Sequence, residues 1–183
     1  MASDPDASLQ AISKVISSDA SIVTRIMKVV NSAFYGFQKK ITNIQHAVSI
    51  LGINAIRNVA FTLSLIDIFP HKQSANFTDL FRWSLCSGIT ADLISAFVGK
   101  GSRSESFLAA LLQNLGQFIF LRYLGDRYIR IMQEAEQRGM KLDIIEKEVM
   151  GIDHMEAGVM VAERWNLPEP VLLSIKYGGN ITR

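Results

Sequence analysis

The chain has 183 residues, 49% of them hydrophobic and 20% charged, so it is long and apolar enough to bury a substantial core. Nineteen Lys and Arg against 17 Asp and Glu leave a net charge of +2, which argues against the one-signed field of a strong nucleic-acid binder or a membrane-surface protein. The single cysteine, Cys86, excludes an internal disulfide and a cysteine-rich zinc site, as expected in a reducing compartment.

Apolar residues recur at helical spacing through the first half of the chain, and no segment shows the alternation of a hairpin strand. Asp19 is placed to cap one predicted helix, and Gly52 is placed to end the next. The polar span 71–78, which follows Phe69 and Pro70, predicts a loop. The helices that the spacing predicts in this half cover residues 8–16, 22–34, 41–51, 54–68 and 78–98.

The second half begins after GKGSRS at 99–104, which predicts a flexible connection. The predicted helix that follows is apolar on most sides and is therefore expected at the centre of the fold. Asp153 is expected to cap a later helix, and Gly139 to end another. The helices predicted in this half cover residues 107–123, 128–138, 142–150, 154–165 and 169–177.

The whole pattern predicts an all-α fold, a compact bundle of about nine or ten short helices. We expect one domain over 1–183, while a division into halves 1–99 and 104–183, joined by the link 99–104, stays open. The longest uncharged run, 106–121, is shorter than the roughly 20 apolar residues that a membrane-spanning helix needs. The polar start MASDPDASLQ does not predict a secretory signal, so we expect a cytoplasmic protein without membrane insertion.

Side chains that could carry catalysis are scattered along the sequence. His46, His71 and His154 lie in separate segments, and none forms the spaced pair of a metal site. The chain also lacks a glycine-rich phosphate loop and a nucleophile elbow. We therefore predict no catalytic residue, no metal and no cofactor.

Two other patterns have structural interpretations. Glycines stand at predicted helix ends, where their freedom to adopt positive φ is sufficient explanation. A group of acidic residues sits among Arg and Lys on amphipathic helices, which predicts solvated faces. These acidic residues are Glu134, Glu136, Glu146 and Glu148.

The stretch NSAFYGF at 31–37 places three aromatic rings and two short polar side chains at the end of a predicted helix. Asn31 and Ser32 can bond to the backbone there, and Gly36 lets the chain leave through a left-handed turn. These features favour a rigid corner between two helices. The alternative is an edge that binds a protein partner, or that binds an anion or nucleotide through nearby basic residues. The residues of this candidate partner or ligand surface are Asn31, Ser32, Tyr35, Gly36, Lys39, Lys40 and Arg57.

Two runs of the N-terminal half, DPDASLQAISKVISSDASIVTRIMKVVNSAFYG and ITNIQHAVSILGINAIRNVAFTLSL, resemble the opening of the HDOD domain family, a bacterial relative of the HD and HD-GYP phosphohydrolases. The resemblance continues through FRWSL at 81–85, LLQNLGQ at 111–117 and DHMEAGVMVAERWNLPEPV at 153–171, so it covers nearly the whole chain. It implies an HD-like fold and a signalling or regulatory output role in the bacterial cytoplasm. The family pattern begins about one helix earlier, which implies a trimmed start.

The departures from the family's catalytic relatives bear on function. In those relatives a His on the long helix, a His-Asp dyad on the next core helix and a further Asp hold metal ions that activate water. Here the long-helix position falls at or next to Trp83, and the dyad positions fall on Gln113 and Asn114. An indole and two neutral amides cannot replace anionic and imidazole ligands. The resemblance therefore implies a degenerate metal site.

Gln113 and Asn114 are expected to tie helices together, because a buried amide without a partner costs about 1–3 kcal/mol. A residual pocket in which these amides contact a nucleotide is the open alternative. For the whole chain, the leading hypothesis is a non-catalytic module that binds protein partners. The alternative is an HD-type, metal-dependent phosphohydrolase that acts on a nucleotide or cyclic dinucleotide.

Overall fold

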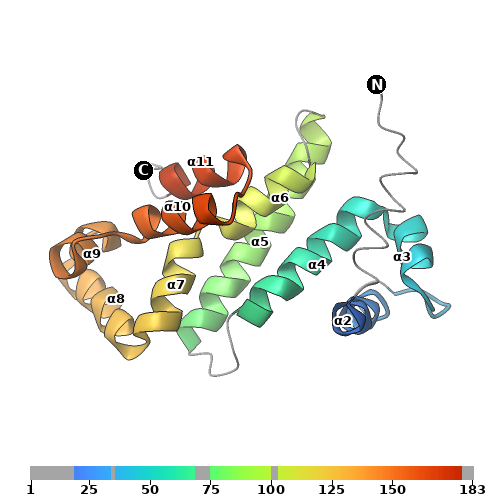
Figure 1. Cartoon of the computed structure of the whole chain (residues 1–183), viewed down its shortest axis with the longest axis horizontal. Coiled ribbons are helices and arrows are strands. Elements are labelled where there is room, and N and C mark those ends of the chain that lie inside the picture. Colours follow the sequence, from blue (N-terminus) through green and yellow to red (C-terminus); the bar gives the residue numbers. More distant parts are fainter. Residues whose placement is uncertain (1–18, 34–35, 69–74, 100–102, 179–183) are drawn as a thin grey trace. The chain divides into compact units, whose positions relative to one another are not determined.

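The structure, a computed structural model, describes residues 19–33, 36–68, 75–99 and 103–178. Within these ranges the regular elements are all α-helices, labelled α2 to α11 in Figure 1, which confirms the predicted all-α fold. The predicted helix 8–16 and Tyr35 lie outside the described residues. The chain divides into two compact units, Met1–Ile68 and Phe69–Arg183. The division does not fall at the link 99–104, because the helices on either side of that link pack against each other.

The N-terminal unit contains α2 (Ala20–Val30), α3 (Ile44–Leu51) and α4 (Ile53–Ile68). Asp19 caps α2 as predicted, since its carboxylate accepts hydrogen bonds from two backbone amides of the first turn, at 2.9 and 3.2 Å. Helix α3 begins three residues later than predicted, because the side chain of Asn43 caps it by accepting from the His46 amide at 2.7 Å. Gly52 ends α3 with φ 81°, as predicted.

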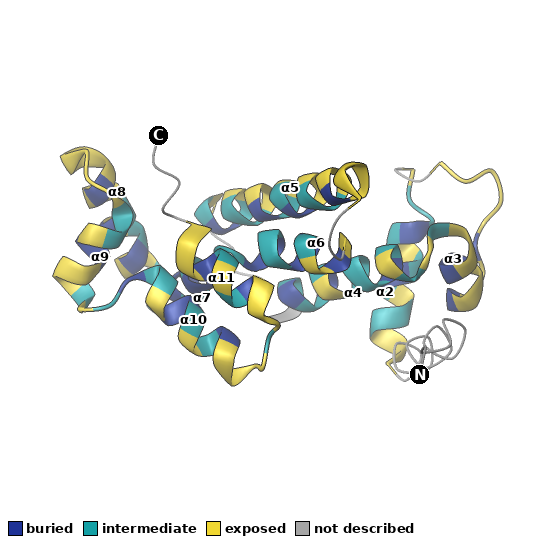
Figure 2. Ribbon diagram, turned by 90° about the horizontal axis from the view of Figure 1, so that it is seen from above, coloured by how far each residue is buried: buried dark blue, intermediate teal, exposed yellow. Residues whose placement is uncertain are grey.

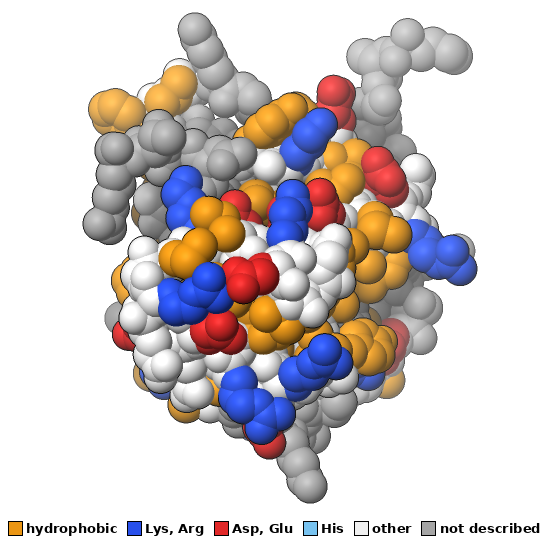
Figure 3. Space-filling view, turned by 90° about the vertical axis from the view of Figure 1, so that its left-hand side faces the viewer, with side chains coloured by type: hydrophobic (Ala, Val, Ile, Leu, Met, Phe, Trp, Pro, Cys, Tyr) orange, Lys and Arg blue, Asp and Glu red, His pale blue; other side chains and the backbone are white. Residues whose placement is uncertain are grey.

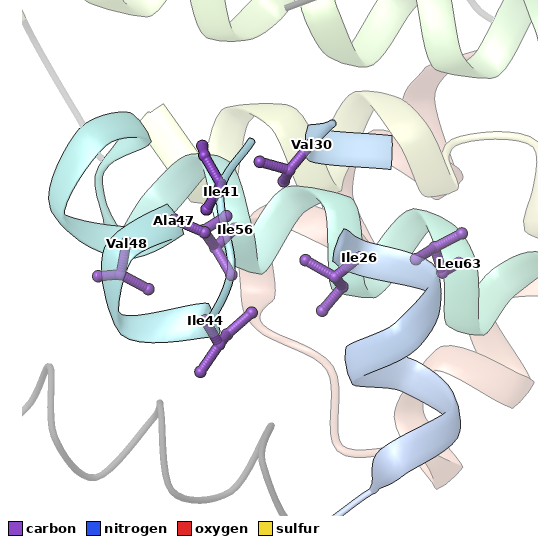
Figure 4. Close-up of a cluster of buried hydrophobic side chains, with 8 residues drawn as sticks. All are labelled: Ile26, Val30, Ile41, Ile44, Ala47, Val48, Ile56 and Leu63. Atoms are coloured by element: carbon purple, nitrogen blue, oxygen red, sulfur yellow. The ribbon is translucent and has the colours of Figure 1, made fainter. Parts of the chain in front are cut away.

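One hydrophobic cluster holds these three helices together (Figure 4). Ile26 and Val30 of α2 stand four residues apart on one helix face, and Ile44 and Val48 of α3 do the same. Such i, i+4 pairs allow each short helix to contribute one apolar stripe to a shared core. The buried members of the cluster are Ile26, Val30, Ile41, Ile44, Ala47, Val48, Ile56 and Leu63.

The C-terminal unit differs from the prediction in its central helix. The single helix predicted over 107–123 is wrong, because the chain turns at Gln113 and Asn114 and forms two helices. Asn114 is the N-cap residue of α7, and its side chain bonds to Ser84 of α5. The helices of this unit are α5 (Ala75–Val98), α6 (Arg103–Leu112), α7 (Leu115–Leu124), α8 (Asp126–Arg138), α9 (Leu142–Met150), α10 (His154–Arg164) and α11 (Glu169–Tyr177).

Three glycines inside helices set how closely the helices of this unit pack. A Cβ on Gly88 of α5 would lie 3.1–3.3 Å from atoms of Phe107 in α6. A Cβ on Gly116 of α7 would overlap the carbonyl oxygen of His154 in α10, and one on Gly158 would lie 2.8 Å from Ile175 Cγ2. The interpretation of the glycines as helix ends alone is therefore wrong for these three, although Gly139 does end α8 in a left-handed conformation.

One stretch of the described residues, Arg103–Leu124, is long and apolar enough by composition to cross a membrane. Helices α3 and α4 would pass the same test only as a pair bent by 118°. The stretch Arg103–Leu124 is interrupted by the turn at Gln113 and Asn114. Of its apolar 18-residue segment, 44% is buried inside the structure. Core helices of soluble proteins have the same composition, so length and composition alone are weak support for a membrane span.

Candidate functional site

Asn114 stands in the turn between α6 and α7 and reaches the long helix α5. Its side-chain amide nitrogen Nδ2 donates a hydrogen bond to Ser84 Oγ at 3.1 Å. Ser84 is fully buried, so both neutral groups find a partner inside the protein. The expectation that Asn114 ties helices together is confirmed by this bond.

The two candidates for the long-helix position, Trp83 and its neighbour Ser84, differ in burial. Trp83 is 72% exposed, whereas Ser84 is fully buried and bonds to Asn114. Adjacent residues of a helix point about 100° apart, so a motif that places the position at or next to Trp83 does not settle which of the two faces inward. Gln113 is partly buried near the end of α11, where a Cβ on Gly178 would lie 3.7 Å from its Cβ and Oε1 atoms.

The donor set at this site does not fit the metal centre of the related hydrolases. A hydroxyl and two amides supply neither the imidazole nor the carboxylate that holds a transition metal. Among the residues that the structure describes, no group of three or more His, Cys, Asp and Glu could hold a metal ion. The absence of catalysis remains a prediction.

A buried polar cluster, which the sequence patterns did not reveal, joins α8, α9 and α10. Glu146 of α9 is fully buried and accepts hydrogen bonds from the Tyr128 hydroxyl at 2.5 Å and from the His154 backbone amide at 2.8 Å. Its Oε2 atom also lies 2.6 Å from His154 Nδ1. The predicted solvated face is therefore wrong for Glu146, because a charge pattern on one helix does not show the partners on two others.

The Tyr128 side chain acts only as a hydrogen-bond donor in this cluster. Burial, and after it the nearby Glu146 carboxylate, raises the pKa of the Tyr128 phenol far above its ordinary value. The phenol is consequently protonated at every physiological pH. We infer that the cluster has a structural role in joining three helices.

Asp153 forms the predicted N-cap of α10 within a reciprocal capping box. It accepts from the Glu156 backbone amide at 2.8 Å, while its own backbone amide donates to the Glu156 side chain at 3.2 Å. Lys147 lies 2.9 Å from the Asp153 carboxylate. Burial acts to raise the pKa of Asp153, but the Glu156 amide and the Lys147 ammonium outweigh it and hold that pKa below its ordinary value.

The corner after α2 is closed by the side chain of Asn31. Its Nδ2 donates to the carbonyl oxygens of Met27 and Ile41, both at 2.9 Å, and its Oδ1 accepts from the Ile41 amide at 2.8 Å. Ser32 contributes a backbone bond to Val29 at 3.0 Å. Gly36 has φ 60°, the left-handed conformation predicted for it. The geometry of Asn31 thus supports the rigid-corner interpretation.

The basic residues proposed for the partner surface differ in their surroundings. Lys39 and Lys40 are exposed in the loop between α2 and α3. Arg57 of α4 is half-buried and donates to Asn54 at 3.2 Å. Of the candidate surface that the structure describes, the exposed part is therefore the stretch 36–40 of the loop.

The surface formed by α8 and α9 carries interspersed charges of both signs (Figure 3). Arg138 pairs with Glu134 and with Glu148, each at 3.0 Å. Lys147 also pairs with Glu156, at 3.0 Å. These pairs neutralise one another locally, and surface pairs of this kind contribute little to stability.

Comparison with known proteins gives consistent matches over almost the whole chain. The model of one family, described as the HDOD domain, matches residues 1–181. An uncharacterized protein of Treponema pallidum (strain Nichols) is 27% identical over 97% of this chain and 35% of its own length. This chain therefore spans about a third of that relative.

Solved structures share the fold. An HDOD domain protein with unknown function from Geobacter sulfurreducens superposes with a TM-score of 0.82 at 24% identity, over 97% of this chain and 60% of that protein. A candidate signal transduction protein from Marinobacter aquaeolei VT8 also gives a TM-score of 0.82, at 22% identity, over 98% of this chain and 41% of that protein. At these identities the likeness establishes the fold and no more.

Proposed function

The chain belongs to the HDOD domain family, and from this premise we propose that it is a non-catalytic signalling or regulatory module that acts by binding protein partners. The observation that supports this proposal is the hydrogen bond between Asn114 and Ser84. The resemblance implies that Asn114 stands where the hydrolytic relatives have a charged metal ligand, and its neutral amide bonds to the neutral Ser84 hydroxyl.

The neutral pair also removes the need for an ion in the core. Several carboxylates gathered at one buried position repel each other unless a cation compensates their charge. The Ser84 hydroxyl and the Asn114 amide need only one hydrogen bond, which they form across the interface between α5 and the 113–114 turn. The C-terminal unit is therefore expected to be stable without a metal, as a scaffold for surfaces that bind other proteins.

Metal analysis tests the non-catalytic part of the proposal. We expect the full chain, purified without chelator, to contain iron and manganese far below one ion per chain. We also expect added Mn²⁺ not to promote hydrolysis of bis(p-nitrophenyl) phosphate, because the site lacks ligands for the ion. Elemental analysis by mass spectrometry and a colorimetric assay measure these quantities. A stoichiometric metal that is retained by the wild type and lost in Asn114→Ala would overturn the proposal, and Mn²⁺-dependent hydrolysis beside it would establish the phosphohydrolase alternative.

The exposed loop between α2 and α3 is the proposed contact for a partner. The double variant Lys39→Glu, Lys40→Glu is expected to lower the retention of specific partners by about tenfold, because reversed charges oppose a complementary acidic surface. The immobilised chain is exposed to lysate of the source organism, and retained proteins are quantified by mass spectrometry. The matched control Arg130→Glu, Lys141→Glu reverses two exposed charges on the other unit. Equal retention by both double variants would exclude the loop as the binding surface.

A further inference from the structure

The two sides of the long helix α5 differ in the size of their side chains. The side that packs on α6 is lined by small buried residues, Ser84, Gly88 and Ser95. The opposite side carries large apolar side chains that are exposed, and Figure 2 marks exposed residues along α5 in yellow. We call this side the outer face of α5, and it consists of Trp83, Cys86, Thr90, Leu93, Ile94 and Phe97.

The outer face has the spacing of a helix-packing seam. Positions 83, 86, 90, 93 and 97 alternate steps of three and four residues over two heptads, which is the a/d pattern of a coiled coil. At 100° per residue, all six side chains of the face fall within a sector of about 100°. Such a seam therefore fits a second helix lying along α5.

The exposed area of the outer face has the size of a stable interface. Trp83 is 72% exposed and Phe97 is 94% exposed, while Leu93 and Ile94 are exposed by 61% and 57%. Together these four side chains offer roughly 650 Å² of apolar surface, given the area of aromatic and aliphatic side chains. The largest apolar patch of a typical monomer is about 300–600 Å², and each partner in a standard interface buries about 800 Å².

We propose that the outer face of α5 binds the same face of a second copy of this chain, with the two helices antiparallel about a two-fold axis near Thr90. Trp83 and Phe97 each stand seven residues from Thr90, so this symmetry places Trp83 of one copy against Phe97 of the other at both ends. The six side chains of the face are uncharged, so two copies meet without repulsion. Antiparallel helices also align their dipoles favourably.

Light scattering of the full chain during size-exclusion chromatography tests the proposal. With rising concentration we expect a mass approaching twice the 20.4 kDa of one chain. The variant Trp83→Glu, Leu93→Glu is expected to have the mass of one chain throughout, with unchanged helical circular dichroism, because both side chains are exposed. The matched control Met160→Glu, Leu173→Glu alters exposed apolar residues on α10 and α11 and should still dimerise. A wild type that remains a single chain at every concentration, or a dimer that the α5 variant preserves, overturns the proposal.

Cross-linking at Cys86, the only cysteine in the sequence, tests whether the two helices are antiparallel. Antiparallel pairing about Thr90 separates the two Cys86 positions by about 12 Å along the helix axis. A disulfide cannot span that separation, whereas a long bismaleimide can. We expect covalent dimers with bismaleimide and none with a copper oxidant. Rapid disulfide formation at Cys86 would overturn the antiparallel arrangement.

Discussion

Replacing Gly116 with alanine is expected to reduce the free energy of unfolding by about 3 kcal/mol, at the upper end of the range for overpacking. The added Cβ would overlap the carbonyl oxygen of His154 and lie 2.6 Å from its carbonyl carbon. Both atoms belong to the backbone of α10, so no side-chain rotation can relieve the overlap. Helices α7 and α10 would have to move apart, which would also disturb the close approach of Gly158 to Gly116. Urea denaturation followed by circular dichroism measures the loss.

Gly178→Ala is the matched control for this substitution. Gly178 follows α11 with φ −60° and ψ −28°, a conformation that alanine adopts readily. Its Cβ would meet the side chain of Gln113 at 3.7 Å, an ordinary contact distance. We expect Gly178→Ala to change the free energy of unfolding by no more than about 0.5 kcal/mol, with a small gain from reduced freedom of the unfolded chain. Equal stability of both alanine variants would show that α7 and α10 do not require the close approach at Gly116.

Glu146→Ala is expected to cost about 3 kcal/mol or more of unfolding free energy. The substitution removes the acceptor of the Tyr128 hydroxyl and of the His154 backbone amide, and it leaves these donors buried without partners. Glu146 thus bonds to residues of both α8 and α10. Differential scanning fluorimetry and urea denaturation should both show the loss.

Two further variants separate the hydrogen bonds of Glu146 from the general effect of changing a glutamate. Glu146→Gln keeps one acceptor oxygen but turns an amide donor toward the other donors of the cluster, so an intermediate loss is expected. Glu136→Ala truncates an exposed glutamate and should change the free energy of unfolding by less than about 0.5 kcal/mol. If Glu146→Ala were as mild as Glu136→Ala, the buried cluster would not be a structural junction.

By itself the sequence determined the all-α class, the order of the helices and several of their ends. Asp19, Gly52, Gly139 and Asp153 act where they were expected, because caps and stops depend on residues within one turn of a helix. The HDOD resemblance was also readable, since it depends on motifs in order along the chain. Asn114 was also expected to bond between helices, as it does.

Only the tertiary structure decided which side chains meet. The bond from Asn114 to Ser84 spans 30 residues, and those from Glu146 to Tyr128 and to His154 span 18 and eight. The spacing of residues along one helix does not show which residues of another helix they contact. The turn at 113–114 and the burial of Glu146 were therefore missed. The close approach at Gly116 was missed for the same reason, because it is set by the backbone of a helix about 40 residues away.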